Sequence, residues 1–248
     1  MPSGMFLACR ATSGRLAAVA ASGIRHVEVP LPAPDQAGSL SAAVAAHGLA
    51  ISSVQVPLHV EVEIDLAEVD RRFQAARDLG AGIVFSSARA ADGDVAAAYA
   101  RLRQVGDVAA RHGLVVALET HPNVITNGDV ARRTMEAVAH PNVRVNYDTA
   151  NVHYYNRGVD SVAELRKVLP YVAALHLKES KGAYESFDFP PLGQGIVDFP
   201  AIFRLLDEAG FQGPTTLEIE FENHPDPEGE FVRTLQASVA YLKRIGIS

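Results

Sequence analysis

Residues 114–121 read LVVALETH, in which five consecutive apolar residues lead into Glu119, Thr120 and His121. A short apolar run of this kind is typical of a strand that is buried on both faces of a parallel sheet. Just before it, residues 94–112 carry apolar side chains at helical spacings and stop at a glycine that can close a helix. These two segments therefore predict a helix followed by a buried strand.

The same alternation of helical segment and apolar run recurs along the chain. Further helices are predicted at residues 66–79, 199–209 and 231–245. Strands that alternate with helices predict a parallel sheet with helical crossovers. The glycines placed to end helices are Gly23, Gly48, Gly80, Gly113 and Gly210. The eight predicted strands are residues 5–8, 26–31, 51–58, 82–87, 114–121, 143–151, 172–180 and 215–222.

Eight units of strand and helix in 248 residues predict an α/β chain that forms a single (β/α)8 TIM barrel domain over residues 1–248. An open, doubly wound sheet is the alternative. The sequence lacks the GxGxxG and P-loop motifs that such sheets often use for phosphate binding, which counts against it. The longest connection, residues 181–197, follows the seventh strand, and we expect it to form a lid that contacts substrate.

Composition excludes several classes of partner and site. The net charge is −7, and no block of basic residues marks a nucleic-acid surface. No apolar run approaches the roughly 20 residues of a membrane span, and the N-terminus lacks a signal-peptide pattern, so we expect a cytoplasmic protein. The one cysteine, Cys9, leaves no intramolecular disulfide and is expected to be a buried small residue.

Four consecutive predicted strands each end with an ionisable residue, namely Glu119, Asp148, His176 and Glu218. Because the strands of a TIM barrel end at one face, we expect these side chains to lie together. Burying them is costly unless a cation compensates. Three carboxylates and one imidazole predict a site for Mn, Mg or Co, with Zn as a weaker fit. Taken singly, Glu119 could pair with an arginine, Asp148 could cap a helix and His176 could be a core histidine.

Other polar residues close to these strand ends are candidates for contact with substrate. His121 follows Glu119 by two positions and therefore points to the same side of the strand, as an auxiliary base or a hydrogen-bond donor. A histidine at the rim of the barrel is the structural alternative. The candidates for substrate binding are Asn151, Lys178, His59 and Glu220, each of which could instead be a solvated side chain at a strand end.

The segments that carry these residues resemble the xylose-isomerase-like barrel superfamily of sugar isomerases and epimerases. The resemblance extends from about Ala109 to the C-terminus, and it implies that the metal and an enediolate take part in the reaction. It also implies that Glu119 and Glu218 flank a keto sugar, where one removes a proton and the other returns it. A homo-oligomer is compatible with this family. The matching segments are ALETH (117–121), NYDTAN (146–151), ALHLKES (174–180), PPLGQGIVDFPAIFRLLDEAGFQG (190–213) and TTLEIE (215–220).

One departure from the family pattern keeps a second reaction open. Many sugar epimerases of the superfamily have Asp-x-Gly-His where residues 148–151 read DTAN, and their histidine contacts substrate. Asn151 can hydrogen-bond a hydroxyl group but cannot take a charge. The alternative is a lyase such as an inosose dehydratase or a 3-keto-glycoside hydratase, and a non-catalytic sugar-binding barrel is a third class. The apurinic-site endonucleases of the superfamily need further histidine ligands, which the sequence does not visibly supply.

Overall fold

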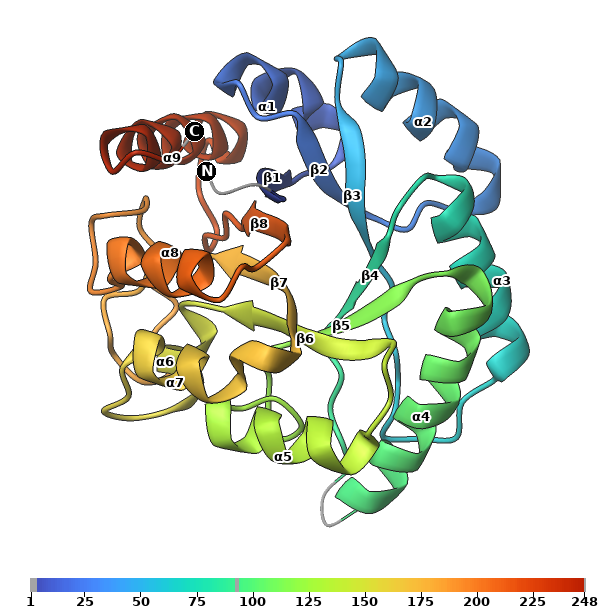
Figure 1. Ribbon diagram of the computed structural model, residues 1–248. Helices are drawn as coiled ribbons and strands as arrows, with labels where there is room; N and C mark the ends of the chain where they lie inside the picture. Colours follow the sequence, from blue (N-terminus) through green and yellow to red (C-terminus); the bar gives the residue numbers. More distant parts are fainter. Residues whose placement is uncertain (1–3, 92–93, 248) are drawn as a thin grey trace.

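The structure, a computed structural model, describes residues 4–91 and 94–247, in which eight strands form a closed ring inside a layer of helices (Figure 1). Each strand pairs in parallel with the next, and the last pairs with the first. The predicted (β/α)8 barrel is therefore confirmed. The strands are β1 (Met5–Arg10), β2 (His26–Pro30), β3 (Ala50–Gln55), β4 (Ile83–Ser86), β5 (Val115–Glu119), β6 (Val143–Asp148), β7 (Val172–Leu177) and β8 (Gly213–Leu217).

The helices lie between consecutive strands, with α9 after the last strand and beside the first helix (Figure 1). Short 3-10 turns, η1 (Ser13–Arg15), η2 (Pro34–Gln36) and η3 (Leu169–Tyr171), adjoin some of them. The helices are α1 (Leu16–Ser22), α2 (Ala37–Ala46), α3 (Leu66–Asp78), α4 (Val95–His112), α5 (Gly128–Val138), α6 (Asn151–Tyr155), α7 (Ser161–Val168), α8 (Phe199–Glu208) and α9 (Pro227–Arg244).

Helix boundaries follow local capping chemistry. The Asp65 carboxylate accepts hydrogen bonds from the first backbone amides of α3, and Gly113 ends α4 with a positive φ that suits a residue without a Cβ. The other four glycines predicted to end helices also have positive φ. The last helix begins at Pro227, four residues before the predicted start, because Asp226 caps it and proline is favoured in the first turn.

Most strands end earlier than their apolar patterns predict. The last residue of each strand determines which side chains lie at the open end of the barrel. The ends of β3, β5, β7 and β8 lie two to five residues before the predicted ones. Single backbone bonds continue beyond them, as from Glu218 N to Leu177 O at 3.2 Å, before the chain turns into a loop. In contrast, β1 extends two residues further than predicted, to Arg10, because Arg10 still pairs with Glu28 of β2.

Two register shifts bring polar side chains next to one another inside the barrel. Between β6 and β7 the register changes after Val145, so that Asp148 lies beside His176. Between β2 and β3 it changes after Val27, so that Glu28 lies beside Ser53. Because side chains alternate along a strand, one additional residue changes which of them face the interior.

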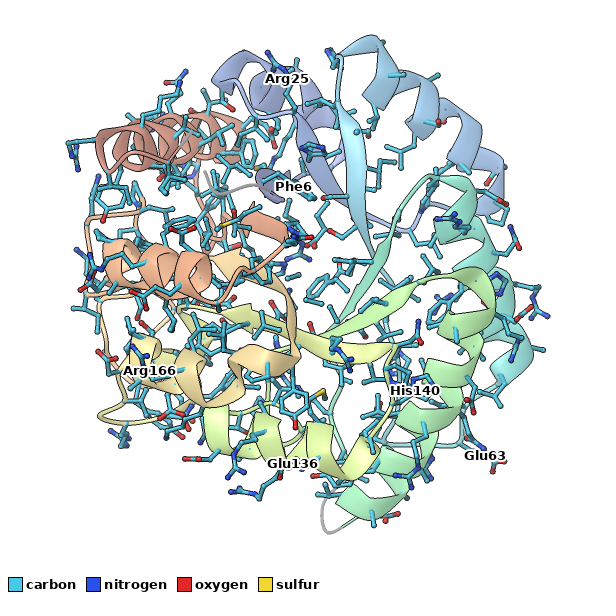
Figure 2. The ribbon with its side chains drawn as sticks, in the orientation of Figure 1. Phe6, Arg25, Glu63, Glu136, His140 and Arg166 are labelled. Atoms are coloured by element: carbon cyan, nitrogen blue, oxygen red, sulfur yellow. The ribbon has the colours of Figure 1, made fainter. Side chains whose placement is uncertain are left out.

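The remainder of the barrel is packed as the apolar patterns predict. The buried faces of α3 and α4 include Phe73 and Leu102, and Cys9 is buried as expected. Charged side chains on the outer helices and loops point away from the barrel, as Glu136 and Arg166 do (Figure 2). Within residues 4–91 and 94–247, we find no helix with the length and apolar character that crossing a membrane requires.

The loop at residues 181–197 is fixed at its end by a buried carboxylate. Glu179, just before the loop, accepts backbone hydrogen bonds from Gly193 at 2.8 Å and from Val197 at 3.0 Å. A Cβ on Gly195 would lie 2.2 Å from the carbonyl oxygen of Ser180, so only glycine fits this close approach. The end of the predicted lid is therefore part of the barrel framework.

We expect Glu179→Gln to lower the free energy of unfolding by about 2 kcal/mol, because the amide nitrogen would face a buried N–H that then lacks an acceptor. The loop should also open more often, which limited trypsin digestion would detect as faster cleavage after Lys181. Asp188→Asn, an exposed change in the same loop, is the matched control. Equal cleavage rates in the two variants would contradict this role of Glu179.

Candidate metal centre and active site

Four buried ionisable side chains meet at the end of the barrel, as the strand ends predict. Glu119 and Asp148 are the last residues of β5 and β6, His176 lies near the end of β7, and Glu218 follows β8 directly. One ligand atom from each residue lies within 4.8 Å of the ligand atoms of the others. These four residues, called the cluster below, could therefore hold a metal ion.

His176 is oriented so that one ring nitrogen faces the carboxylates of the cluster. Its Nδ1 lies 2.9 Å from Glu119 Oε1, 3.4 Å from Glu218 Oε2 and 4.0 Å from Asp148 Oδ2. Its Nε2 lies 3.0 Å from Glu28 Oε1, and Glu28 in turn accepts a hydrogen bond from the Ser53 hydroxyl at 2.7 Å. This contact crosses the barrel interior and fixes the imidazole ring from the side opposite the carboxylates.

One carboxylate oxygen of Asp148 caps the turn into α6, and the other is available to a metal ion. Its Oδ1 accepts hydrogen bonds from the backbone of Ala150 at 2.7 Å and Asn151 at 2.8 Å, which fix the turn into α6. Its Oδ2 is buried and, among the described residues, has no hydrogen-bond partner. A buried carboxylate oxygen without a partner is costly, and a hard divalent cation satisfies it. The donor set of the cluster thus fits such an ion.

The carboxylates of the cluster titrate very differently. Burial raises the pKa of Asp148 to about 7, a shift that the cation of Lys178 opposes and the neighbouring glutamates reinforce. Burial and Glu218 also oppose ionisation of Glu119, but hydrogen bonds from His121 and His176 lower its pKa to about 2. Burial likewise opposes ionisation of Glu218, yet Lys178 and His176 hold its pKa well below the ordinary value.

Two cationic side chains border the cluster on the Glu218 side. The ammonium group of Lys178 lies 3.0 Å from Glu218 Oε2 and 3.1 Å from Asn151 Oδ1, and it also contacts Glu220. The guanidinium group of Arg10 contacts Glu218 and donates a hydrogen bond to Gln55 at 2.9 Å. Burial disfavours the charged form of Lys178, but the carboxylates of Glu218 and Glu220 raise its pKa, so Lys178 stays cationic.

A cavity of about 280 Å³ opens directly over the cluster, and we call it the cluster pocket. One part of its wall is charged and polar, and the other is aromatic. The loop at residues 181–197 supplies Phe187 and Phe189, and the Lys178 ammonium lies 4.4 Å from the centre of the Phe189 ring. The lining residues are Arg10, Gln55, Phe85, Ser87, Glu119, His121, Asn151, Tyr154, Tyr155, Lys178, Phe187, Phe189, Glu218 and Glu220.

Four of the five further candidates named from the sequence line this pocket: His121, Asn151, Lys178 and Glu220. His121 Nδ1 lies 2.9 Å from Glu119 Oε2. The structure does not bring His59 there: its side chain is 72% exposed, and its Nδ1 lies 3.0 Å from Glu61 Oε1. The reason is the early end of β3, which makes Gln55 the β3 residue that lines the pocket.

Sequence reasoning missed Arg10, Glu28, Gln55 and Ser87, all of which lie around the cluster. Ser87 donates a hydrogen bond to Glu119 Oε2 at 2.6 Å. Glu28 had a detectable signal, because it is a carboxylate in the middle of the apolar run at residues 26–31. Arg10 likewise follows the first apolar run directly, as Glu119 follows the fifth.

Comparisons with known proteins agree with this architecture. Residues 16–245 match the family model described as Xylose isomerase-like TIM barrel. The L-ribulose-5-phosphate 3-epimerase UlaE of Salmonella typhi is 26% identical over 239 residues, which are 94% of this chain and 78% of that protein. The 3-dehydroshikimate dehydratase of Bacillus anthracis is 33% identical over 94 residues, which are 37% of this chain and 32% of that protein. The crystal structure of the probable 3-DHS dehydratase AsbF from Bacillus anthracis matches with a TM-score of 0.77 at 17% identity, covering 96% of this chain and 99% of that chain.

The raised pKa of Asp148 has a measurable effect on stability in metal-free protein. A carboxyl group whose pKa rises from 3.8 to about 7 on folding favours the folded state at low pH, and this contribution is lost as the pH rises through about 7. Asparagine does not titrate. We therefore expect the free energy of unfolding of the parent chain, relative to Asp148→Asn, to fall by ~2–3 kcal/mol between pH 5 and pH 8. Denaturant unfolding with a chelator measures it, and a difference that does not change with pH would contradict the shift.

Proposed function

The chain belongs to the xylose isomerase-like TIM barrel family, and on that premise we propose that it is a divalent-metal-dependent isomerase or epimerase of a keto sugar. The observation that carries this proposal is the position of two carboxylates. Glu119 from β5 and Glu218 after β8 both line the cluster pocket, and they reach it from strands that are not neighbours in the barrel. Two separate carboxylates are what proton removal and proton return on opposite faces of a carbon require.

The proposed ligands are Glu119, Asp148, His176 and Glu218, and Mn, Mg, Co or Zn are the candidate ions. Their donor atoms and the unsatisfied Oδ2 of Asp148 support this assignment. When bound, a divalent ion supplies Lewis-acid polarisation of a carbonyl group and stabilises the charge of an enediolate.

The residues of the chain supply the acid and base chemistry. Glu119 and Glu218 are both ionised at neutral pH, because their pKa values are lowered, so either can accept the proton beside the carbonyl. His121 lies next to Glu119 and can exchange a proton with it. Once the other glutamate has taken up a proton from solvent, donation of that proton to the opposite face of the same carbon inverts the carbon. Return of the abstracted proton to the neighbouring carbon instead interconverts an aldose and a ketose.

Other lining groups are suited to holding a polyol. Asn151, Lys178 and Gln55 present an amide or ammonium group to the pocket, and these groups can hydrogen-bond to hydroxyls. Phe187 and Phe189 add aromatic rings to the lining, with the Phe189 ring next to the Lys178 ammonium. This pairing of a polar wall with an aromatic wall matches the two kinds of surface that a sugar ring presents.

Dehydration of the same keto sugar is the second candidate, and Lys178 favours it. Its ammonium group reaches the pocket wall beside Glu218. If a glutamate takes the C–H proton while the C–O bond at the next carbon breaks, a proton from Lys178 lets the hydroxide leave as water. The relative named as a dehydratase, which matches over 37% of this chain, is consistent with this reaction.

We expect Glu28→Gln to weaken metal binding by roughly 10- to 100-fold, the cost usually seen when the partner that orients a ligating histidine is lost. The glutamine amide is uncharged, so it cannot replace the charge-assisted hydrogen bond with which the Glu28 carboxylate orients the His176 ring. Titration calorimetry with Mn²⁺ measures the dissociation constant. Glu28→Asp should recover part of the affinity, and exposed Glu63→Gln is the control. Unchanged affinity in Glu28→Gln would contradict this role.

The reaction itself is tested by proton NMR in D2O with Mg²⁺-loaded protein and a panel of ketoses, inososes and 3-keto-glycosides. We expect loss of the C–H signal beside the carbonyl of one substrate while an epimer or isomer accumulates. Glu119→Gln and Glu218→Gln should each slow this exchange at least about 100-fold, the usual contribution of a positioned general base. The exposed Glu63→Gln is again the control.

The other outcomes separate the alternatives. Loss of water from the substrate, with no epimer formed, would assign the dehydration instead. If metal-loaded protein exchanges no proton in any of these sugars, neither reaction is correct, and the non-catalytic sugar-binding barrel becomes the better interpretation.

A further inference from the structure

A second cavity, of about 350 Å³, adjoins the cluster pocket at the open end of the barrel. We call it the side groove and define it by Arg10, Thr12, Arg15, Phe187, Glu220 and Phe221. Arg10, Phe187 and Glu220 line both cavities, so these three side chains are the partition between them. A molecule bound over the cluster is therefore separated from the side groove by side chains alone.

The lining of the side groove combines aromatic faces with hydrogen-bonding groups. Phe187 is 41% exposed, and Phe221 is half-buried. Thr12 and Glu220, which carry a hydroxyl and a carboxylate, line the same cavity. A pyranose ring offers C–H faces that pack on aromatic side chains and a rim of hydroxyls that need donors and acceptors, so this lining suits a sugar ring.

We propose that the side groove binds the second ring of a glycosylated keto sugar whose reacting ring lies in the cluster pocket. This inference rests on the proposed function, which it makes more specific: the substrate is a keto-disaccharide or keto-glycoside. A further cavity, of about 660 Å³, continues the groove and shares Ala11, Thr12 and Pro30 with it. The open space therefore extends beyond the side groove at Ala11, Thr12 and Pro30.

The charges in the side groove favour a neutral ring over a phosphate group. Arg15 already donates to exposed Glu228 at 2.9 Å, and its guanidinium lies over the Phe231 ring. Arg10 is engaged by Glu218 in the cluster. Glu220, which lines the same groove, would repel an anion. A phosphate would thus meet two arginines that are already paired with carboxylates, and the carboxylate of Glu220 beside them.

Binding of matched ketoses to Mg²⁺-loaded protein tests the proposal. The probes are D-fructose, two disaccharides that contain a fructose unit (isomaltulose and lactulose), and D-fructose 6-phosphate. We expect at least one disaccharide to bind roughly tenfold more tightly than fructose, the gain that a well-placed aromatic contact supplies. Titration calorimetry gives the dissociation constants, and deuterium exchange is followed in the same samples.

Phe221→Leu is the informative variant, because Phe221 lines the side groove and leucine preserves apolar packing. We expect it to bring the ratio of disaccharide to fructose affinity close to one. Val62→Ala, on a side chain that is 56% exposed and lines neither cavity, should preserve the ratio. If Phe221→Leu leaves the preference intact, the second ring binds elsewhere and the proposal is wrong.

Two further results would overturn the proposal. One is equal affinity for fructose and both disaccharides. The other is preferential binding of fructose 6-phosphate that Arg15→Gln abolishes, which would assign the groove to a phosphate. A preference for a disaccharide, without deuterium exchange in any sugar, would support the side groove as a binding site and contradict the proposed function. Exchange in fructose without that preference would support the proposed function and contradict the role of the side groove.

Discussion

The charge balance at the open end of the barrel is the constraint on which the site depends. Five carboxylates, from Glu28, Glu119, Asp148, Glu218 and Glu220, face three cationic groups, from Arg10, His176 and Lys178. Buried charges are tolerated only when they are paired. In metal-free protein, burial raises the pKa of Asp148, and its proton reduces the deficit from two charges to one. Burial opposes the charged form of His176, but the glutamates raise its pKa, so it counts among the cations. With a divalent ion bound, an ionised Asp148 and a neutral His176 give the same net charge. A divalent metal ion and two protons are thus equivalent in the net charge of this site.

This balance requires that the side chains meet, and the backbone ensures it through its irregularities. A uniform register between β6 and β7 would place Leu175, not His176, beside Asp148, and it is the shift after Val145 that corrects this. The shift after Val27 likewise gives Glu28 the Ser53 hydroxyl that holds its carboxylate. Two of the contacts around the cluster, Asp148 beside His176 and Glu28 beside Ser53, therefore depend on irregularities in strand pairing.

The predictive power of the sequence follows from the same physics. Glu119, Asp148, His176 and Glu218 could be found because a run of apolar residues ends at or near each of them, and parallel strands bring such ends together. Arg10 and Glu28 stand at or within apolar runs, but their roles depend on Glu218 and His176, which are distant in sequence, so no local pattern encodes these contacts. His59 lies outside the cluster pocket for a local reason: the apolar run at residues 51–58 continues past the last strand residue, Gln55, into a loop that contains buried Val56 and Leu58. An apolar run indicates which residues are buried, and residues beyond the last paired position of a strand can still be buried.

In the two proposed reactions, a metal ion held by the cluster would stabilise the same enediolate. The choice between proton return and loss of water would then depend on which group reaches the neighbouring carbon first. That group is a carboxylate on one route and the Lys178 ammonium on the other, and Lys178 is held by Glu218, Glu220 and Asn151. Glu220 also lines the side groove. A ring bound there would therefore compete with Lys178 for Glu220, so that substrate length and reaction type are coupled through a single carboxylate. This coupling offers a physical reason why one ligand set can serve different reactions on different sugars.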